Sequence, residues 1–227
     1  MSTFRRKIRN MAEFALMIAM SPFHKPMVGD CPWFDEGGKT LFGEGIAKAT
    51  TLLEYGCGGS TVFAAKNGLH VVSVETDARY ASAVNEKLHA LGLASKAQVF
   101  HSNIGPTLKW GYPLRDSPTP VNIGCWTDYT AKPWREAKAK GLRTDVVLID
   151  GRFRVACVIR SLIEMDALGI EVPILVDDYA GRSDYAAVLE VCSLHRLSGR
   201  MAELHRKSGI TLERLQQAFA VSIINSR

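Results

Sequence analysis

A buried strand that breaks into a glycine turn constrains the fold of this chain more than any other feature. Residues 52–61 read LLEYGCGGST, an apolar run that leads through Gly56, Gly58 and Gly59 into a segment suited to a helix. Glycine lets the backbone approach a ligand closely, and the first turn of a helix offers free N–H groups. A second apolar run ends at Glu75, whose carboxylate can accept both hydroxyls of a ribose. The pattern predicts a nucleotide-sized binding site.

Strand and helix patterns alternate beyond this turn, which predicts a parallel sheet. We expect strands at residues 52–55, 70–75, 97–102, 145–149 and 173–176. Ser60 and Asp77 are the expected helix N-caps, and a helix that includes Cys192 should follow the fifth strand. Residues 193–207 read equally well as an antiparallel pair around Ser198-Gly199 or as a long loop, and residues 211–225 read as a helix. The predicted fold class is α/β, a Rossmann-like, doubly wound, mostly parallel sheet with helices on both faces and an antiparallel last strand.

Right-handed crossovers place the carboxyl ends of the parallel strands on one edge, where ligands bind in open α/β sheets. That edge should collect Gly56, Glu75, Asn103, Asp150 and Asp177. The 227 residues are expected to form a single domain, 1–227, with an N-terminal helical and flap segment at 1–50 and an aromatic insertion loop at 105–144. The insertion is rich in tryptophan, tyrosine and proline, and it reads equally as a substrate lid or as an aromatic subcore.

Composition narrows the class of protein and its partners. The net charge of +5 is modest, and the basic clusters read as solvated faces, so we do not expect a nucleic-acid partner. Five cysteines without a CxxC pair argue against a disulfide framework and favour a cytoplasmic location. The N-terminal apolar stretch is too short for a membrane span. Its helical spacing predicts an amphipathic helix that covers the core or a partner subunit of a homo-oligomer, formed by Phe4, Ile8, Met11, Ala15 and Ile18.

The spacing of the glycines separates two kinds of nucleotide enzyme. A dinucleotide fingerprint requires a third glycine where this chain has Thr61. Glu54 to Gly59 instead resembles motif I of the class I S-adenosylmethionine-dependent methyltransferases, and Val74-Glu75 resembles their acidic second motif. The resemblance covers about residues 50–180 and implies S-adenosylmethionine as the cofactor. It implies a cofactor site formed by Glu54, Gly56, Gly58, Gly59, Ser60, Glu75 and Asn103. Glu54 could alternatively cap backbone N–H groups, and Asn103 could simply end a strand.

Three aspartates at the ends of adjacent strands form a second candidate site. Asp150, Asp177 and Asp178 would repel one another when unpaired, and Mg²⁺ or Ca²⁺ would relieve that repulsion. The set resembles the metal site of catechol-type O-methyltransferases, which implies catalytic roles for Asp150 and Asp178. The match is partial, because Asp178 replaces an asparagine and Phe153 stands where those enzymes have a lysine. Salt bridges to Arg152, Arg154 or Arg182 are the alternative.

The function predicted from these patterns is S-adenosylmethionine-dependent methyl transfer to a small-molecule acceptor. One alternative is a metal-assisted O-methyltransferase that uses Asp150, Asp177 and Asp178. Another is a non-catalytic S-adenosylmethionine-binding module, because a fold does not fix a function. The chain lacks the Asn/Asp-Pro-Pro-Tyr/Phe run of enzymes that methylate amino groups of nucleic acids.

Overall fold

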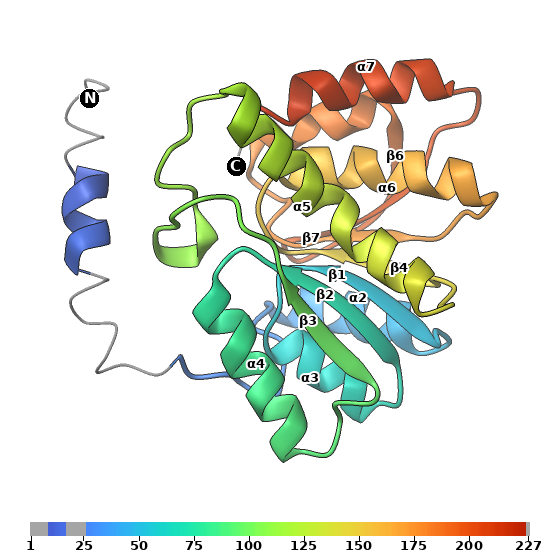
Figure 1. Ribbon diagram of the computed structural model, residues 1–227. Coiled ribbons are helices and arrows are strands. Elements are labelled where there is room, and N and C mark those ends of the chain that lie inside the picture. Colours follow the sequence, from blue (N-terminus) through green and yellow to red (C-terminus); the bar gives the residue numbers. More distant parts are fainter. Residues whose placement is uncertain (1–8, 17–25, 226–227) are drawn as a thin grey trace.

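The computed structural model describes residues 9–16 and 26–225, which include a seven-stranded sheet with helices on both faces (Figure 1). The strand order is β3-β2-β1-β4-β5-β7-β6. Strands β1 to β5 pair in parallel, whereas β7 is antiparallel to both β5 and β6. Their bounds are β1 Thr51–Tyr55, β2 His70–Glu75, β3 Ala97–His101, β4 Val146–Ile149, β5 Ile174–Val176, β6 Cys192–Ser198 and β7 Met201–Arg206. The predicted Rossmann-like fold is confirmed, and of the two interpretations of residues 193–207 the antiparallel pair is the one formed.

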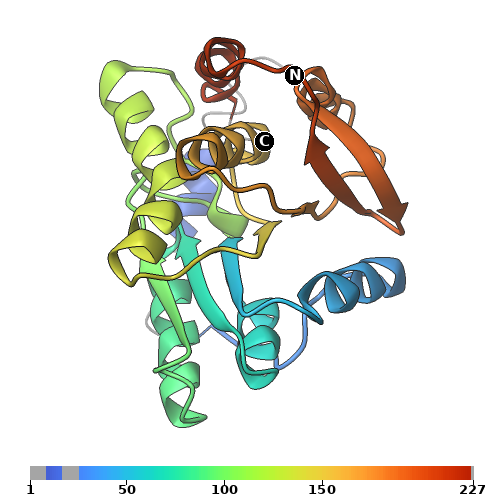
Figure 2. The same ribbon diagram turned by 90° about the vertical axis from the view of Figure 1, so that its right-hand side faces the viewer.

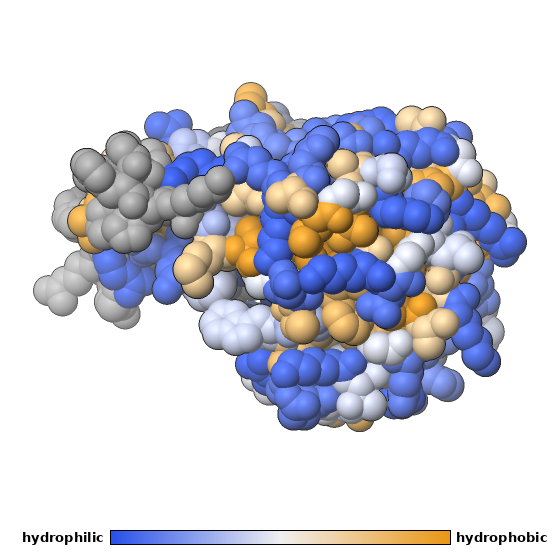
Figure 3. Space-filling view, turned by 90° about the horizontal axis from the view of Figure 1, so that it is seen from below, coloured by the Kyte–Doolittle hydropathy of each residue, from blue (hydrophilic) through white to orange (hydrophobic). Residues whose placement is uncertain are grey.

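Two layers of helices bury the two faces of the sheet. Helices α5 (Pro120–Ala139), α6 (Arg154–Leu168) and α7 (Leu212–Ser222) pack with the larger apolar cluster, which includes the inward side chains of β1, β4 and β7. Helices α2 (Glu36–Ile46), α3 (Gly59–Lys66) and α4 (Ala78–Ala90) pack with the smaller cluster on the opposite face. The β6–β7 hairpin forms one end of the sheet, and helix α2 contacts both of its strands (Figure 2). Figure 3 shows the surface of the molecule from below the view of Figure 1. This surface is mostly hydrophilic, with apolar residues between the hydrophilic ones.

The aromatic segment 105–144 is not one long loop, because its second half is helix α5. Thr119 caps this helix by accepting a hydrogen bond from the Asn122 N–H at 3.2 Å, and a proline occupies the first helical position. Trp126, Tyr129 and Trp134 are buried side chains of this helix. The expectation failed because Pro133 reads as a helix breaker, whereas here it lies buried inside the helix. The aromatic subcore therefore accounts for residues 120–139, and only residues 105–119 remain a loop.

Two further expectations change in the structure. The N-cap of α3 is Gly58 rather than Ser60, whereas Asp77 caps α4 as predicted. Residues 183–190 form a 3-10 helix, and Cys192 lies in β6 rather than in that helix.

The predicted N-terminal helix is described only in part. Residues 9–16 are helical, and Met11 is exposed, so the described part does not cover the core with that side chain. Phe4, Ile8 and Ile18 lie outside the described residues. No described helix is both long enough and apolar enough to cross a membrane.

Candidate functional site

The glycine turn between β1 and α3 lies at the carboxyl edge of the sheet, and two of its glycines have left-handed backbone. Gly56 has φ of 91°, and a Cβ there would lie 3.1 Å from the backbone of Asp150 and Gly151. Gly58 has φ of 153°, and its Cβ would lie 2.9 Å from the Tyr80 hydroxyl. L side chains rarely adopt this backbone conformation. The turn therefore requires glycine at both positions.

Glu54 supports the turn from below. Its buried carboxylate accepts hydrogen bonds from the hydroxyls of Ser60, Thr61 and Ser73, the bond from Thr61 being 2.6 Å long. Thr61 Oγ1 in turn accepts the Gly58 N–H at 2.9 Å. Burial raises the pKa of the Glu54 carboxyl, while the three hydroxyl donors act to lower it. Glu54 and Ser60, both predicted to bind the cofactor, are thus used within the protein to hold the shape of the turn.

Gly59 makes room for the protein's own chain. A Cβ at this position would overlap the backbone carbonyl of Cys31, so the segment before α2 crosses the start of α3. Asp30 secures that segment by ion pairs with Lys66 at 2.9 Å and with Lys87. Hydrogen bonds from Lys87 and Lys66 lower the pKa of Asp30 to about 2. The close approach at Gly59 is therefore to backbone, whereas the sequence predicted an approach to ligand.

Glu75 ends β2 with its two carboxylate oxygens in different surroundings. Oε1 accepts the backbone N–H groups of Thr76 at 2.6 Å and Asp77 at 3.0 Å. Oε2 instead lies 3.7 Å from the thiol of Cys57, in the glycine turn. Burial raises the pKa of the Glu75 carboxyl, and the hydrogen bonds from Asp77 and Thr76 oppose that rise. One oxygen thus fixes the side chain and leaves the other beside the turn.

Residues 105–113 cover this part of the edge. The Gly111 carbonyl accepts the Thr76 hydroxyl at 3.2 Å, and a Cβ on Gly111 would lie 3.5 Å from Glu75 Oε1. Trp110, with φ of 64°, stacks on Trp33 with ring centroids 5.9 Å apart. The exposed Trp33 belongs to the segment predicted as a flap, although the residues after it enter α2. The segment before α2 and the 105–119 loop therefore meet beside Glu75.

Asn103 lies in the connection that follows β3, at the same edge. It is exposed, and its Oδ1 accepts the Gly105 N–H at 2.9 Å. The side-chain oxygen therefore shapes the start of the 105–119 loop. The amide nitrogen is the group that remains for a ligand.

Two of the three aspartates, Asp150 and Asp178, are paired with arginines. Asp150 Oδ1 lies 2.9 Å from Arg154, and Asp178 lies 2.9 Å from Arg182 and 3.2 Å from Arg200. In the described part of the chain, the oxygens of these three aspartates do not all lie within 4.8 Å of one another. The salt-bridge alternative describes this arrangement, and the geometry gives no support to a shared Mg²⁺.

Asp177 differs from its two neighbours because it is buried and its Oδ1 has no hydrogen-bond partner among the described residues. Burial, together with the charges of Asp150 and Asp178, raises the pKa of Asp177 to about 7. Burial also raises the pKa of Asp150, against the opposing effect of Arg154. The edge thus holds carboxyl groups that gain protons more readily than ordinary aspartates.

Arg154 joins the ends of β4 and β5. Its side chain is only 3% exposed, and it donates to the carbonyls of Gly151 at 3.0 Å, of Asp150 at 3.2 Å and of Asp177. Hydrogen bonds of this kind are strong because the donor is charged. The sequence feature that could have indicated this role of Arg154 is a basic residue in the first turn of an otherwise apolar helix.

Comparison with solved structures identifies the family. A crystal structure of a methyltransferase-like protein from Silicibacter pomeroyi is 31% identical in sequence, with a TM-score of 0.71 over 86% of this chain and 97% of that protein. The chain belongs to the class I S-adenosylmethionine-dependent methyltransferase superfamily.

More distant structures from this methyltransferase superfamily also align with the chain. A methyltransferase from Geobacter sulfurreducens is 14% identical over 88% of this chain and 90% of that one, with a TM-score of 0.44. An O-methyltransferase from Bacillus cereus in complex with SAH is 13% identical over 94% and 78%, with a TM-score of 0.45. No protein-family model matches the sequence, and no curated protein sequence matches it.

In this methyltransferase-family protein, a cavity of about 650 Å³ opens next to the carboxyl edge of the sheet. Its walls come from the N-terminal helix, the 105–119 loop and the start of the 3-10 helix after β5. The lining includes three basic, three acidic and three aromatic side chains: Arg9, Lys109 and Arg182; Glu13, Asp116 and Asp184; Trp110, Tyr112 and Tyr185. None of the glycines of the turn is among the residues that line this cavity.

Tyr112 is the cavity residue whose phenol has a lowered pKa. From the sequence it was noted only as one of the aromatic residues of the 105–144 segment. The guanidinium of Arg152 lies 4.2 Å from the centre of its ring. Burial acts to raise the pKa of the phenol, but Arg152 and Arg182 outweigh it and hold that pKa below its ordinary value. Tyr112 therefore loses its proton more readily than an ordinary tyrosine.

Proposed function

We propose that this protein transfers the methyl group of S-adenosylmethionine to a small-molecule acceptor at the carboxyl edge of the sheet. The observation that carries the proposal is the pairing of the glycine turn with Glu75 Oε2, which has a thiol contact and no backbone donor among the described residues. Membership of the superfamily supports the same cofactor.

The residues present fit the chemical groups of this cofactor. The turn has no side chain at Gly56 or Gly58, and Glu75 Oε2 beside it can accept ribose hydroxyls. Two buried polar atoms without a partner, Arg152 Nε and Asp177 Oδ1, lie near the ends of β4 and β5, where they suit the charged groups of an amino acid. The Asn103 amide nitrogen suits the ring nitrogens of adenine. Glu54 and Ser60 act indirectly, by holding the turn.

When bound, S-adenosylmethionine supplies an electrophilic methyl group on a sulfonium. The protein then has to orient the acceptor, exclude water and, for acceptors that carry a proton, remove it. Tyr112 is the residue we assign to proton removal, because neighbouring arginines lower its pKa and it lines the cavity. Asp150 and Asp178 hold arginines at the edge, so we assign them a positioning role in place of the predicted catalytic one.

The cavity next to the edge suits a polar acceptor. Its charges balance, and its three aromatic side chains offer flat apolar surfaces to a ring. The 105–119 loop contacts Thr76 and stacks Trp110 on Trp33. We propose that this loop lifts to admit the cofactor and then separates it from water.

Isothermal titration of S-adenosylmethionine and S-adenosylhomocysteine tests the proposal. We expect one site per chain in the unmodified protein, and binding weakened by at least about tenfold in Glu75→Ala, because two hydrogen bonds to a charged acceptor are lost. The matched control is Glu171→Ala, which removes an exposed carboxylate away from the edge. Absence of binding by the unmodified protein, or equal affinity in both variants, would refute the proposed site. Binding without turnover of a panel of small oxygen and nitrogen acceptors would instead favour the non-catalytic binding module.

A further inference from the structure

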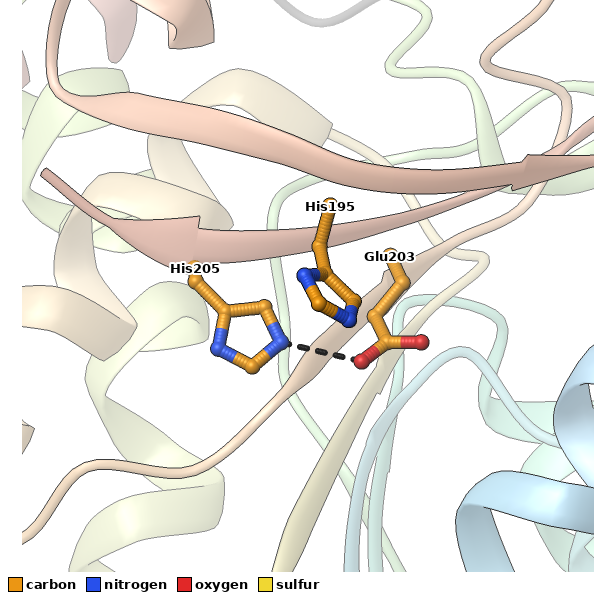
Figure 4. A group of neighbouring side chains, drawn as sticks. All are labelled: His195, Glu203 and His205. Atoms are coloured by element: carbon orange, nitrogen blue, oxygen red, sulfur yellow. Dashed lines mark hydrogen bonds and ion pairs between the residues drawn. The ribbon is translucent and has the colours of Figure 1, made fainter.

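The hairpin of β6 and β7, at the sheet edge farthest from β3, brings together two histidines and a glutamate. His195 comes from β6, and Glu203 and His205 come from β7 (Figure 4). One potential ligand atom from each residue lies within 4.8 Å of the other two. None of the three lines the cavity or the glycine turn. The cluster is therefore separate from the proposed methyl-transfer site.

A β-bulge assembles the cluster. Leu194 pairs with Leu204, but the next pair joins Arg196 to Glu203, so His195 is an extra residue in β6. In a bulge, two residues of one strand oppose a single residue of the other. His195 and Arg196 consequently both lie opposite Glu203. On β7, Glu203 and His205 are two residues apart and share a face, while Leu204 between them is buried on the other face.

The three side chains are already close and partly fixed. The ring centroids of His195 and His205 are 4.7 Å apart, and His205 Nε2 lies 2.9 Å from Glu203 Oε1. Arg196 lies 3.3 Å from the other oxygen, Glu203 Oε2, and is itself held by Glu44 at 2.6 Å. The arginine thus orients the carboxylate through one oxygen and leaves Oε1 facing the imidazoles.

We propose that His195, Glu203 and His205 bind one transition-metal ion of the Zn²⁺ class. Two imidazoles and one carboxylate form a ligand set that Zn²⁺ accepts, whereas Mg²⁺ and Ca²⁺ prefer oxygen ligands alone. The ion takes the place of the hydrogen bond between His205 and Glu203 and joins the edge strand β6 to β7. His195 is exposed, so a fourth coordination position faces solvent and is open to water or to a group from another molecule.

Zinc titration of the full chain, prepared without a histidine tag and stripped with a chelator, tests this site. We expect one Zn²⁺ per chain by calorimetry, visible absorption bands of a Co²⁺ complex, and a melting temperature that rises with added Zn²⁺. His195→Ala and His205→Gln should each weaken binding by at least about tenfold, because each removes a direct ligand. The control is His89→Ala, which removes an exposed histidine of α4 and should leave binding unchanged.

Two results would overturn the metal site: no stoichiometric binding by the unmodified chain, or binding of equal strength in His195→Ala. The exposed position of His195 makes its replacement compatible with folding, so this variant decides the question if His205→Gln fails to fold. Because S-adenosylmethionine binding is measured separately, failure of the metal site leaves the proposed methyl-transfer site untouched.

Discussion

Replacing Thr61 by valine removes the hydroxyl that joins the glycine turn to its buried support, at nearly constant volume. Thr61 is 0% exposed, and its hydroxyl donates to Glu54 at 2.6 Å and accepts the Gly58 N–H at 2.9 Å. A hydrogen bond to a charged group contributes about 1.5–3 kcal/mol, and an unpaired buried N–H costs about 1–3 kcal/mol. Ser60 and Ser73 still donate to Glu54, so part of the first contribution is retained, and we expect a loss of about 2–4 kcal/mol in the free energy of unfolding.

Urea denaturation measures this loss directly. In a chain of this size it corresponds to a fall in melting temperature of about 4–16 °C. The matched control is Thr130→Val, because Thr130 is equally buried but its hydroxyl donates to the Thr127 carbonyl within α5, one turn away in the same helix. Its cost should stay below about 1 kcal/mol. Equal losses in the two variants would refute the argument that Thr61 supports the turn. Weaker S-adenosylmethionine binding by folded Thr61→Val is the second expected result.

Two further predictions concern the edge of the sheet. The pKa of Asp177 rises from 3.8 to about 7 on folding. Between these two pH values the native state therefore binds more protons than the unfolded state. The free energy of unfolding should consequently fall as pH increases from about 4 to about 7. In urea denaturation, Asp177→Asn should reduce this dependence of the unfolding free energy on pH. Asp128→Asn, at an exposed position of α5, should leave it unchanged. An unaltered pH dependence in Asp177→Asn would contradict the raised pKa of Asp177. Trp110→Ala removes the stack on Trp33, a contact that contributes about 0.5–1.5 kcal/mol, and should speed S-adenosylmethionine association by about two- to tenfold in stopped-flow fluorescence. Unchanged association rates would show that the loop does not control entry.

The regular part of the fold was predictable because it depends on local patterns. Each parallel strand is a short apolar run bounded by turn residues, as expected for strands that are buried on both faces of the sheet. The segment around Pro133 was misread, because a proline usually ends a helix and its buried position in α5 depends on distant packing partners.

The candidate site was predictable in position but not in the role of each residue. The need for glycine at Gly56 and Gly58 and the placement of Glu75 at the end of a strand follow from short-range geometry. Glu54 turned out to accept hydrogen bonds from Ser60 and Ser73, and Gly59 lies against the backbone of Cys31. Which side chain lies next to which depends on how helices and strands pack against one another. The residue pattern of a single segment carries no information about that packing.

The sequence by itself determined the sheet, the turn and the acid beside it, because glycine conformations and strand patterns are local properties of the chain. Only the tertiary structure decided which charges are neutralised. It paired Asp150 and Asp178 with arginines, left Asp177 buried without a partner for one oxygen, and aligned His195 with Glu203 and His205 through a bulge. Those outcomes depend on distances of a few ångströms between side chains, and electrostatic and metal-binding chemistry changes steeply over such distances.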